Sequence, residues 1–177
     1  HVRAFQLRHT KPCFGYTLEE HPRPGEFHPD KALERGVPRG PLWAKLQSGD
    51  TVEATDGSRV TPDMVLGQPR SGRKFSFATD TLAFPTIADE VVDSDLFVCE
   101  GMFESALLET AVEKRHMTAE QAAFIAKQAR VKKLALIHYS PRYADFELKR
   151  LLQEAQAVFP DTVLSRDRQV FPIEYRD

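Results

Sequence analysis

The sequence predicts an α/β fold built on a largely parallel sheet. The first observation is the regular alternation of strand-like and helical segments from Arg73 onward, which is typical of parallel strands joined by right-handed crossovers. The second is the apolar run over residues 133–138, KLALIH, which has the character of a strand and ends at a histidine. The third is the capping-box pattern Thr118-Ala-Glu-Gln121, which opens an amphipathic helix.

The N-terminal part of the sequence is predicted to form two short strands, followed by a long segment with little regular structure. Residues 2–7 alternate as a strand does, and residues 16–18 form a second strand after a turn. From residue 19 to residue 72, frequent proline and glycine leave room only for a short helix at 29–35 and a hairpin around Asp56-Gly57. A segment of this length and irregularity is commonly functional.

The remaining elements follow in regular order. Strands are predicted at residues 74–79, 95–99 and 133–138, with short terminal strands at 162–165 and 169–173. Helices are predicted at residues 84–92, 104–114, 119–129 and 145–158.

Composition limits the classes of protein that fit. The formal net charge of the 177 residues is −2, from 24 basic and 26 acidic side chains, so a polyanion site would have to be local. Two cysteines do not make a disulfide framework, which favours a reducing, cytoplasmic compartment. We find neither a signal peptide nor an apolar run of the roughly 20 residues that a membrane helix needs.

Four predicted strands end on residues able to bind a metal ion: His9, Asp80, Cys99 and His138. Strand ends that share one edge of a sheet form a ligand crevice, and imidazole and carboxylate groups suit zinc or manganese. Structural alternatives stay open: a hydrogen-bonded histidine at 138, a helix cap at 80 and an apolar filler at 99. His116 is either a surface residue or part of the site.

Basic side chains in the irregular segment predict either a polyanion contact or an ordinary solvated loop. The cations of this segment include Arg23, Lys31, Arg35, Arg39 and Lys45. Phe27 and Trp43 lie among them in the sequence, a mixture that can hold RNA by charge and stacking.

Motifs in a fixed order then suggest a family. They are His9-Thr-Lys-Pro-Cys-Phe-Gly-Tyr16, Gly40-Pro-Leu-Trp-Ala-Lys-Leu-Gln-Ser-Gly49, Val65-Leu-Gly-Gln-Pro-Arg-Ser-Gly-Arg-Lys74, Thr79-Asp-Thr81, His116-Met-Thr118 and His138-Tyr-Ser-Pro-Arg-Tyr143. Together they resemble ribonuclease Z, the endonuclease that removes 3′ trailers from tRNA precursors. The resemblance covers this whole chain, but only the C-terminal half or so of the family.

The resemblance implies a fold and roles for individual residues. Residues 1–18 and 70–177 would form the C-terminal half of a metallo-β-lactamase αββα sandwich, and residues 19–69 a protruding, Gly/Pro-rich arm that binds tRNA. His9 matches a ligand of one zinc ion, Asp80 the carboxylate bridging two, and His138 a ligand of the second, with manganese or magnesium as alternative ions. The residues expected to contact RNA or phosphate are Thr118, Ser140 and Arg142 near the cleavage site and Arg35, Arg39 and Lys45 in the arm.

Two departures from the family pattern shape the functional hypothesis. Cys99-Glu100-Gly101-Met102 stands where many members have His-Glu-Ala-Thr, so the candidates for proton transfer are Cys99, Glu100 and His116. The motif His-x-His-x-Asp-His is absent, and the chain starts at His1 inside a strand-like run, as if within a larger protein.

We therefore expect a tRNA-processing enzyme that is dimeric and binds two zinc ions per subunit when complete. The isolated chain is expected to be inactive, because its partner would be an N-terminal half that carries the missing motif. Two alternatives remain: a non-catalytic RNA-binding fragment, or a related metallohydrolase that acts on another phosphodiester or ester.

Overall fold

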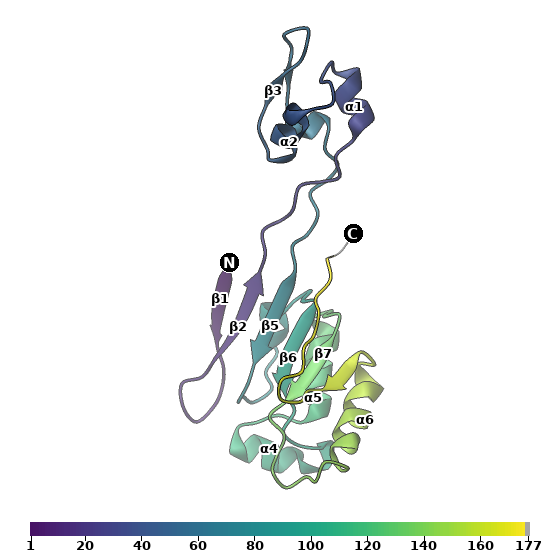
Figure 1. Ribbon diagram of the computed structural model, residues 1–177. Helices are drawn as coiled ribbons and strands as arrows, with labels where there is room; N and C mark the ends of the chain where they lie inside the picture. Colours follow the sequence, from purple (N-terminus) through teal and green to yellow (C-terminus); the bar gives the residue numbers. More distant parts are fainter. Residues whose placement is uncertain (176–177) are drawn as a thin grey trace. The chain divides into compact units, whose positions relative to one another are not determined.

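The structure is a computed structural model that describes residues 1–175 (Figure 1). The chain divides into two compact units. The sheet unit comprises His1–Glu20 and Arg73–Glu174, and the inserted unit is formed chiefly by His21–Gly72. Each unit has a hydrophobic core of its own.

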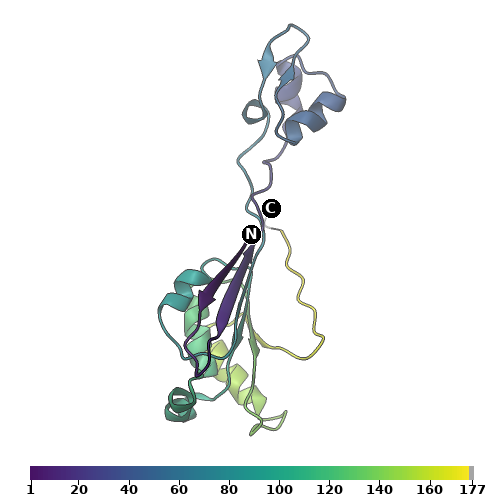
Figure 2. The same ribbon diagram turned by 90° about the vertical axis from the view of Figure 1, so that its left-hand side faces the viewer.

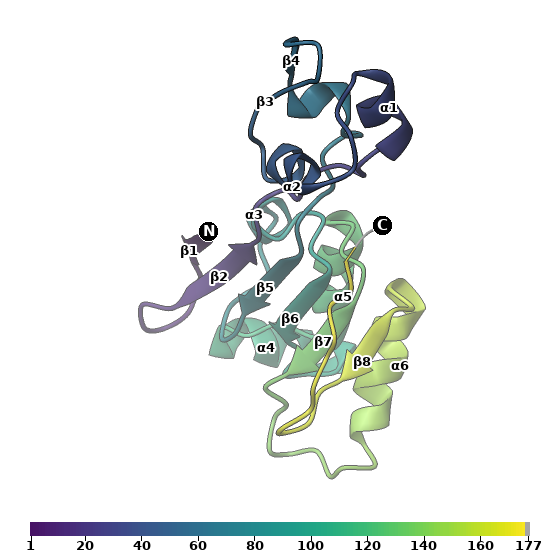
Figure 3. The same ribbon diagram turned by 45° about the horizontal axis from the view of Figure 1, so that its top comes forward.

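A six-stranded mixed sheet forms the framework of the sheet unit, in the order β1-β2-β5-β6-β7-β8 (Figure 3). The β1–β2 and β2–β5 pairs are antiparallel, and the other three pairs are parallel. The predicted α/β class is thus confirmed, with antiparallel strands added at one edge. The strands are Val2–Gln6 (β1), Phe14–Glu19 (β2), Lys74–Ala78 (β5), Leu96–Glu100 (β6), Leu134–Ile137 (β7) and Thr162–Leu164 (β8).

Helices cover one face of this sheet (Figure 2). They are α3 (Thr86–Glu90), α4 (Leu108–Lys114, preceded by the 3-10 turn η2, Ser105–Leu107), α5 (Ala119–Gln128) and α6 (Leu148–Val158). Helix α5 turns alanines such as Ala122 and Ala126 to the core, where they pack with Phe97, Leu134 and Leu136. The predicted capping box is present at the start of α5.

The opposite face of the sheet is largely apolar and partly open. Along β2, Phe14, Tyr16 and Leu18 are 45%, 46% and 47% exposed, while the residues between them face the core. One of these is Gly15, where a Cβ atom would lie 2.3 Å from Cζ of Phe5. The C-terminal segment lies over another part of this face, since Phe171 and Ile173 line a groove with Leu18 and Phe75.

The inserted unit is small but has a closed core. It contains α1 (Pro29–Glu34), α2 (Pro41–Gln47), the two-stranded pair β3 (Val52–Glu53) and β4 (Arg59–Val60), and the 3-10 turn η1 (Pro62–Met64). Ala32, Val37, Leu46 and Val65 are fully buried in it. Helix α2 was not among the predicted elements, although Pro41 at its start and Gly49 beyond its end are typical helix boundaries.

Three predicted elements differ from the structure. The expected strand at residues 169–173 is absent from the described sheet, because Pro172 cannot donate to a ladder and Val170 is 83% exposed. The helix predicted over 84–92 is limited to α3, and α6 begins at Leu148, later than expected.

Among residues 1–175, we find no helix with both the length and the apolar character that a bilayer crossing requires.

Candidate metal centre

Three polar side chains mark one edge of the sheet, where the parallel strands end. Asp80 lies two residues beyond β5, Glu100 is the last residue of β6, and His138 directly follows β7. Because β5, β6 and β7 are parallel neighbours, their C-terminal ends lie together.

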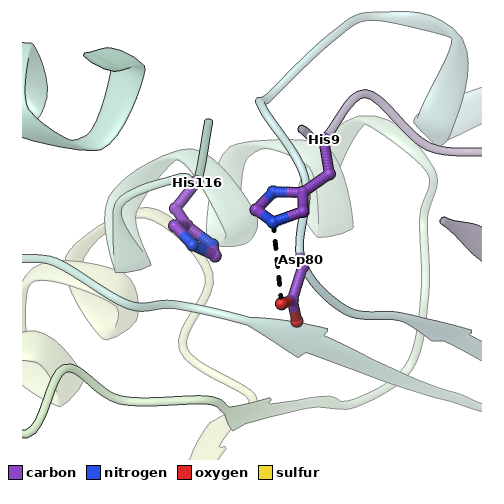
Figure 4. A group of neighbouring side chains, drawn as sticks. All are labelled: His9, Asp80 and His116. Atoms are coloured by element: carbon purple, nitrogen blue, oxygen red, sulfur yellow. Dashed lines mark ion pairs between the residues drawn. The ribbon is translucent and has the colours of Figure 1, made fainter. Parts of the chain in front are cut away.

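Two loops bring further histidines to the same edge. His9 comes from the loop between β1 and β2, and His116 from the connection between α4 and α5. Nε2 of His9 lies 4.0 Å from Oδ2 of Asp80, and Nε2 of His138 lies 3.7 Å from Oδ1 of the same carboxylate. The ring of His116 lies near both of the other imidazoles, at centroid distances of 4.9 Å from His9 and 5.2 Å from His138. Figure 4 shows His9, Asp80 and His116 of this group.

A backbone contact orients His9. Its Nδ1 lies 3.0 Å from the carbonyl oxygen of Arg115, so it donates there and leaves Nε2 directed toward Asp80. Arg115 has a left-handed conformation with φ of 58°, which ends helix α4. A backbone acceptor on the far ring nitrogen is the usual way in which a metal-binding histidine is held in place.

The carboxylate of Asp80 is held in its charged form. Partial burial would raise its pKa, but Thr79 Oγ1 donates to it at 2.6 Å, its own backbone amide also stabilises it, and His138 and His116 lie nearby. The net effect is a lowered pKa. Asp80 is therefore an anion at neutral pH, as a metal ligand has to be.

His116 and Glu100 form a buried pair beside this carboxylate. Nδ1 of His116 lies 3.0 Å and 3.2 Å from the two oxygens of Glu100, whose side chain is completely buried. Backbone amides of Thr81 and Met117 also donate to Glu100, one to each oxygen. The hydrogen bond to Glu100 raises the pKa of His116; burial opposes this effect, and the negative charges of Glu100 and Asp80 add to it.

The backbone at His138 is in a conformation that few residues adopt. Its φ of 59° lies in the left-handed region, where histidine occurs more often than most non-glycine residues. Such positions concentrate at functional sites because the surrounding structure has to maintain them. Here the conformation ends β7 and accompanies the turn of the imidazole toward Asp80.

The donor set fits a divalent cation. Two overlapping groups, His9–Asp80–His116 and Glu100–His116–His138, each place their candidate ligand atoms within 4.8 Å of one another. Imidazole nitrogens around a carboxylate are the ligands that zinc prefers in sites of this kind. The structure thus brings together the three predicted ligands, His9, Asp80 and His138.

The structure pairs His116 with Glu100, two of the three predicted candidates for proton transfer, at this edge. Strand patterns alone did not show that these two side chains would meet, because the loop that carries His116 follows helix α4 and not a strand. The sequence feature that could have placed His116 near this edge is its position two residues before Thr118, which caps α5.

Other predicted site residues lie elsewhere or are engaged in structural contacts. Cys99 is fully buried in the apolar core, 3.9 Å from the sulfur of Met117, and burial raises the pKa of its thiol well above the usual value. This placement argues against the predicted role of Cys99 in proton transfer, because a core thiol is neutral and closed to substrate. Thr118 is also buried, and its hydroxyl accepts from the Gln121 amide to cap α5.

The loop after His138 carries the two remaining candidates of the sheet unit. Ser140 is 7% exposed, and its backbone amide donates to the carbonyl of Met102. Arg142 is exposed, with its guanidinium 5.1 Å from the ring centroid of Phe103. Arg142 is therefore the more accessible of the two for an anion.

The predicted RNA contacts of the inserted unit are three exposed basic side chains. Arg35 follows α1, Arg39 lies 5.8 Å from the ring centroid of Trp43, and Lys45 is on α2. All three side chains are exposed, and none forms an ion pair among residues 1–175. Their charge is thus available to a ligand.

Comparison with known proteins finds relatives that match the whole of this chain. It is 60% identical over 176 residues to ribonuclease Z of Treponema denticola and 41% identical over 175 residues to ribonuclease Z of Methanosarcina acetivorans. Each match covers 99% of this chain and 57% of the relative. A scan of protein-family models returned no match.

Solved structures agree on the fold. Human tRNase Z, short form, superimposes with a TM-score of 0.54 at 21% identity, over 98% of this chain and 43% of that chain. The metallo-β-lactamase fold protein YhfI from Bacillus subtilis gives a TM-score of 0.56 at 16% identity, over 92% of this chain and 45% of that chain. The chain therefore has the metallo-β-lactamase fold, and over its whole length it is similar to a C-terminal portion of ribonuclease Z relatives, of which it spans about 57%.

Proposed function

We propose that the complete protein containing this chain is a metal-dependent endoribonuclease that removes 3′ trailers from tRNA precursors. The observation that carries the proposal is the cluster of three imidazoles around the Asp80 carboxylate, in a chain 60% identical to a ribonuclease Z. Phosphodiester hydrolysis needs charge neutralisation and proton transfer at one point, and this edge of the sheet offers groups for both.

On this proposal, His9, Asp80 and His138 would hold part of a centre of two zinc ions. Bound divalent cations lower the pKa of a water nucleophile and neutralise phosphate charge. The anionic state of Asp80 and the fixed ring of His9 are the properties that favour this assignment.

The His116–Glu100 pair is assigned to proton transfer. Attack on phosphorus breaks the bond to the 3′-oxygen of the tRNA, and that oxygen has to take up a proton as it leaves. The raised pKa of His116 favours the protonated ring, which can donate from Nε2, the nitrogen not bound to Glu100. The products would be a 3′-hydroxyl on the tRNA and a 5′-phosphate on the trailer.

The remaining basic residues are assigned to RNA binding. Arg142 would contact phosphate near the cleavage point, because a planar guanidinium suits a bidentate phosphate contact. The inserted unit, which contains most of the arm expected at residues 19–69, would act as the tRNA-binding arm through Arg35, Arg39 and Lys45. Their exposure and their lack of acidic partners among residues 1–175 favour this role.

The activity is assigned to a longer protein. The chain spans 57% of the length of the ribonuclease Z relatives it matches, and it lacks the motif His-x-His-x-Asp-His. We assign that motif to an N-terminal half, for which the exposed Phe14, Tyr16 and Leu18 offer an apolar surface. We further assign the complete protein to the cytoplasm as a homodimer, a state that light scattering would test.

Cleavage of a 3′-extended tRNA precursor by the complete protein, with zinc or manganese, tests the proposal directly. We expect cleavage at the base of the trailer with the product ends given above, and loss of cleavage in the Asp80→Asn variant. Cleavage of simple phosphodiesters or esters but not of the precursor would indicate another metallohydrolase. Binding without any cleavage by the metal-loaded protein would indicate a non-catalytic RNA-binding protein, and activity of the isolated chain would contradict the assignment to a longer protein.

A further inference from the structure

A cleft of about 730 Å³ is lined in part by His9, a residue of the candidate metal centre. Its walls come from the end of β1 and the loop after it, the segment that follows β5, and the end of helix α4. His9 lines the cleft, and the same side chain points its Nε2 toward Asp80. The cleft thus shares one residue, His9, with the proposed reaction centre.

Two arginines give this cleft a positive charge. The guanidinium of Arg8 lies 4.4 Å from the ring centroid of Phe84, and Nη1 of Arg115 donates to the backbone carbonyl of His9 at 3.4 Å. Neither guanidinium forms an ion pair within residues 1–175, and the residues found to line the cleft include no carboxylate. In a chain of net charge −2, this is a local concentration of uncompensated positive charge.

The two cations are held in place. The stack of Arg8 on Phe84, whose ring is almost fully buried, leaves the exposed guanidinium with its N–H donors for a ligand. Arg115 is bound to His9 twice, since its carbonyl accepts from the His9 ring and its side chain donates to the His9 carbonyl. Gln6 and Thr86 add neutral polar groups to the same walls.

We propose that this cleft binds the single-stranded RNA that flanks the scissile phosphate, with Arg8 and Arg115 contacting consecutive backbone phosphates. This inference rests on the proposed function and extends it to residues that the family motifs quoted above do not include. Guanidinium groups without carboxylate partners bind phosphate through charge-assisted hydrogen bonds and release counterions as they do so. Because Arg115 contacts His9, a strand bound along the cleft would lead directly to the metal centre.

The test uses the complete protein with Arg8→Gln, Arg115→Asn and both changes together. Asparagine at position 115 tolerates the left-handed backbone, and the carbonyl that orients His9 is retained. Lys133→Ala serves as the control, because it removes an exposed cation at the opposite end of β7. Zinc content is measured for every variant, so that loss of metal at His9 is recognised separately.

Binding of short oligouridylate to the metal-free protein is measured by fluorescence anisotropy at several salt concentrations. We expect each arginine change to weaken binding roughly tenfold at low salt, and the double variant to reduce the slope of log Kd against log salt by about 1.4, since a single-strand phosphate contact contributes about 0.7. The Lys133→Ala variant should match the unchanged protein. A double variant with an unchanged slope would overturn the proposal.

Cleavage assays then identify the bound strand and separate the two proposals. If the cleft holds the trailer, the double variant raises KM only for precursors with long trailers. If it holds the acceptor end, KM rises for short and long trailers alike; either result supports the cleft as an RNA site. Unchanged KM for both, with normal cleavage, refutes the cleft and leaves the proposed function intact, whereas absence of cleavage by the unchanged protein refutes the proposed function while the binding slope still tests the cleft.

Discussion

Replacing Glu100 by glutamine tests whether its buried carboxylate organises the metal-centre edge. Each oxygen of Glu100 accepts from one backbone amide, of Thr81 or of Met117, and the two oxygens share Nδ1 of His116. A glutamine side chain has only one accepting oxygen. Whichever way its amide is turned, its NH₂ group faces one of the two backbone N–H donors.

The expected loss of stability follows from this count. One buried backbone amide loses a charged acceptor, a contact worth about 1.5–3 kcal/mol, and the protonated His116 ring loses its anionic partner. We therefore expect Glu100→Gln to lower the free energy of unfolding by about 2–3 kcal/mol. Glu113→Gln changes an exposed residue of α4 and should stay within about 0.5 kcal/mol of the unchanged protein.

The pH dependence of this difference has a definite sign. The pKa of His116 is raised in the folded state, so the stability it contributes is fully present below the unfolded value of about 6.5 and is lost as the pH rises through the folded value. Urea denaturation of the metal-free complete protein, followed by circular dichroism, should give a larger deficit for Glu100→Gln at about pH 6 than at about pH 8. A deficit no larger than that of Glu113→Gln, or one that grows with pH, would refute the reasoning.

Four further predictions concern activity and metal binding in the complete protein. Glu100→Gln should move the alkaline limb of the rate profile to lower pH, because His116 loses the contact that raises its pKa; an unmoved limb would exclude His116 as the acid. Asp80→Asn should lower zinc affinity roughly 100-fold in calorimetric titrations, unlike the exposed-site control Asp145→Asn. Cys99→Ala should keep kcat within about twofold while costing about 1 kcal/mol of stability, and a large loss of kcat would restore a catalytic role for this thiol. Alanine at Arg35, Arg39 and Lys45 together should raise KM for the precursor at constant kcat and lower its salt slope by roughly two to three, whereas an unaffected KM would separate the inserted unit from tRNA binding.

Local sequence patterns were sufficient for most of the sheet unit. Alternation of strands and helices predicted the parallel part of the sheet, and the capping box at Thr118 predicted the start of α5. The predicted final strand failed because Pro172 and the exposed Val170 outweigh its apolar character. Helix α2 was missed because frequent proline and glycine around it were interpreted only as breakers, although they also form its boundaries.

The site was only partly predictable for a related reason. His9, Asp80 and His138 follow strands, so sheet topology alone indicated that they share an edge. The contact between His116 and Glu100 spans 16 residues and depends on how the α4–α5 connection packs, which no local pattern specifies. The core position of Cys99 could have been predicted. Side chains along a strand point alternately to its two faces, which puts Cys99 on the same face of β6 as the buried Phe97.

The pairing of β2 with β5 has a consequence for how this fold can change over time. The antiparallel register runs to Glu19 opposite Lys74, and the amide of Glu20 still donates to the carbonyl of Arg73 at 2.9 Å. The inserted unit therefore occupies the place of a hairpin turn between β2 and β5. The hydrogen bonds that pair these two strands are complete before the inserted unit begins. The entropic cost of closing a loop increases by only about 0.6 kcal/mol for each doubling of the loop length. This segment can therefore be lengthened, shortened or exchanged while Asp80 stays in place after β5. Under the proposed function, the segment assigned to substrate binding can thus change independently of the strand that presents Asp80.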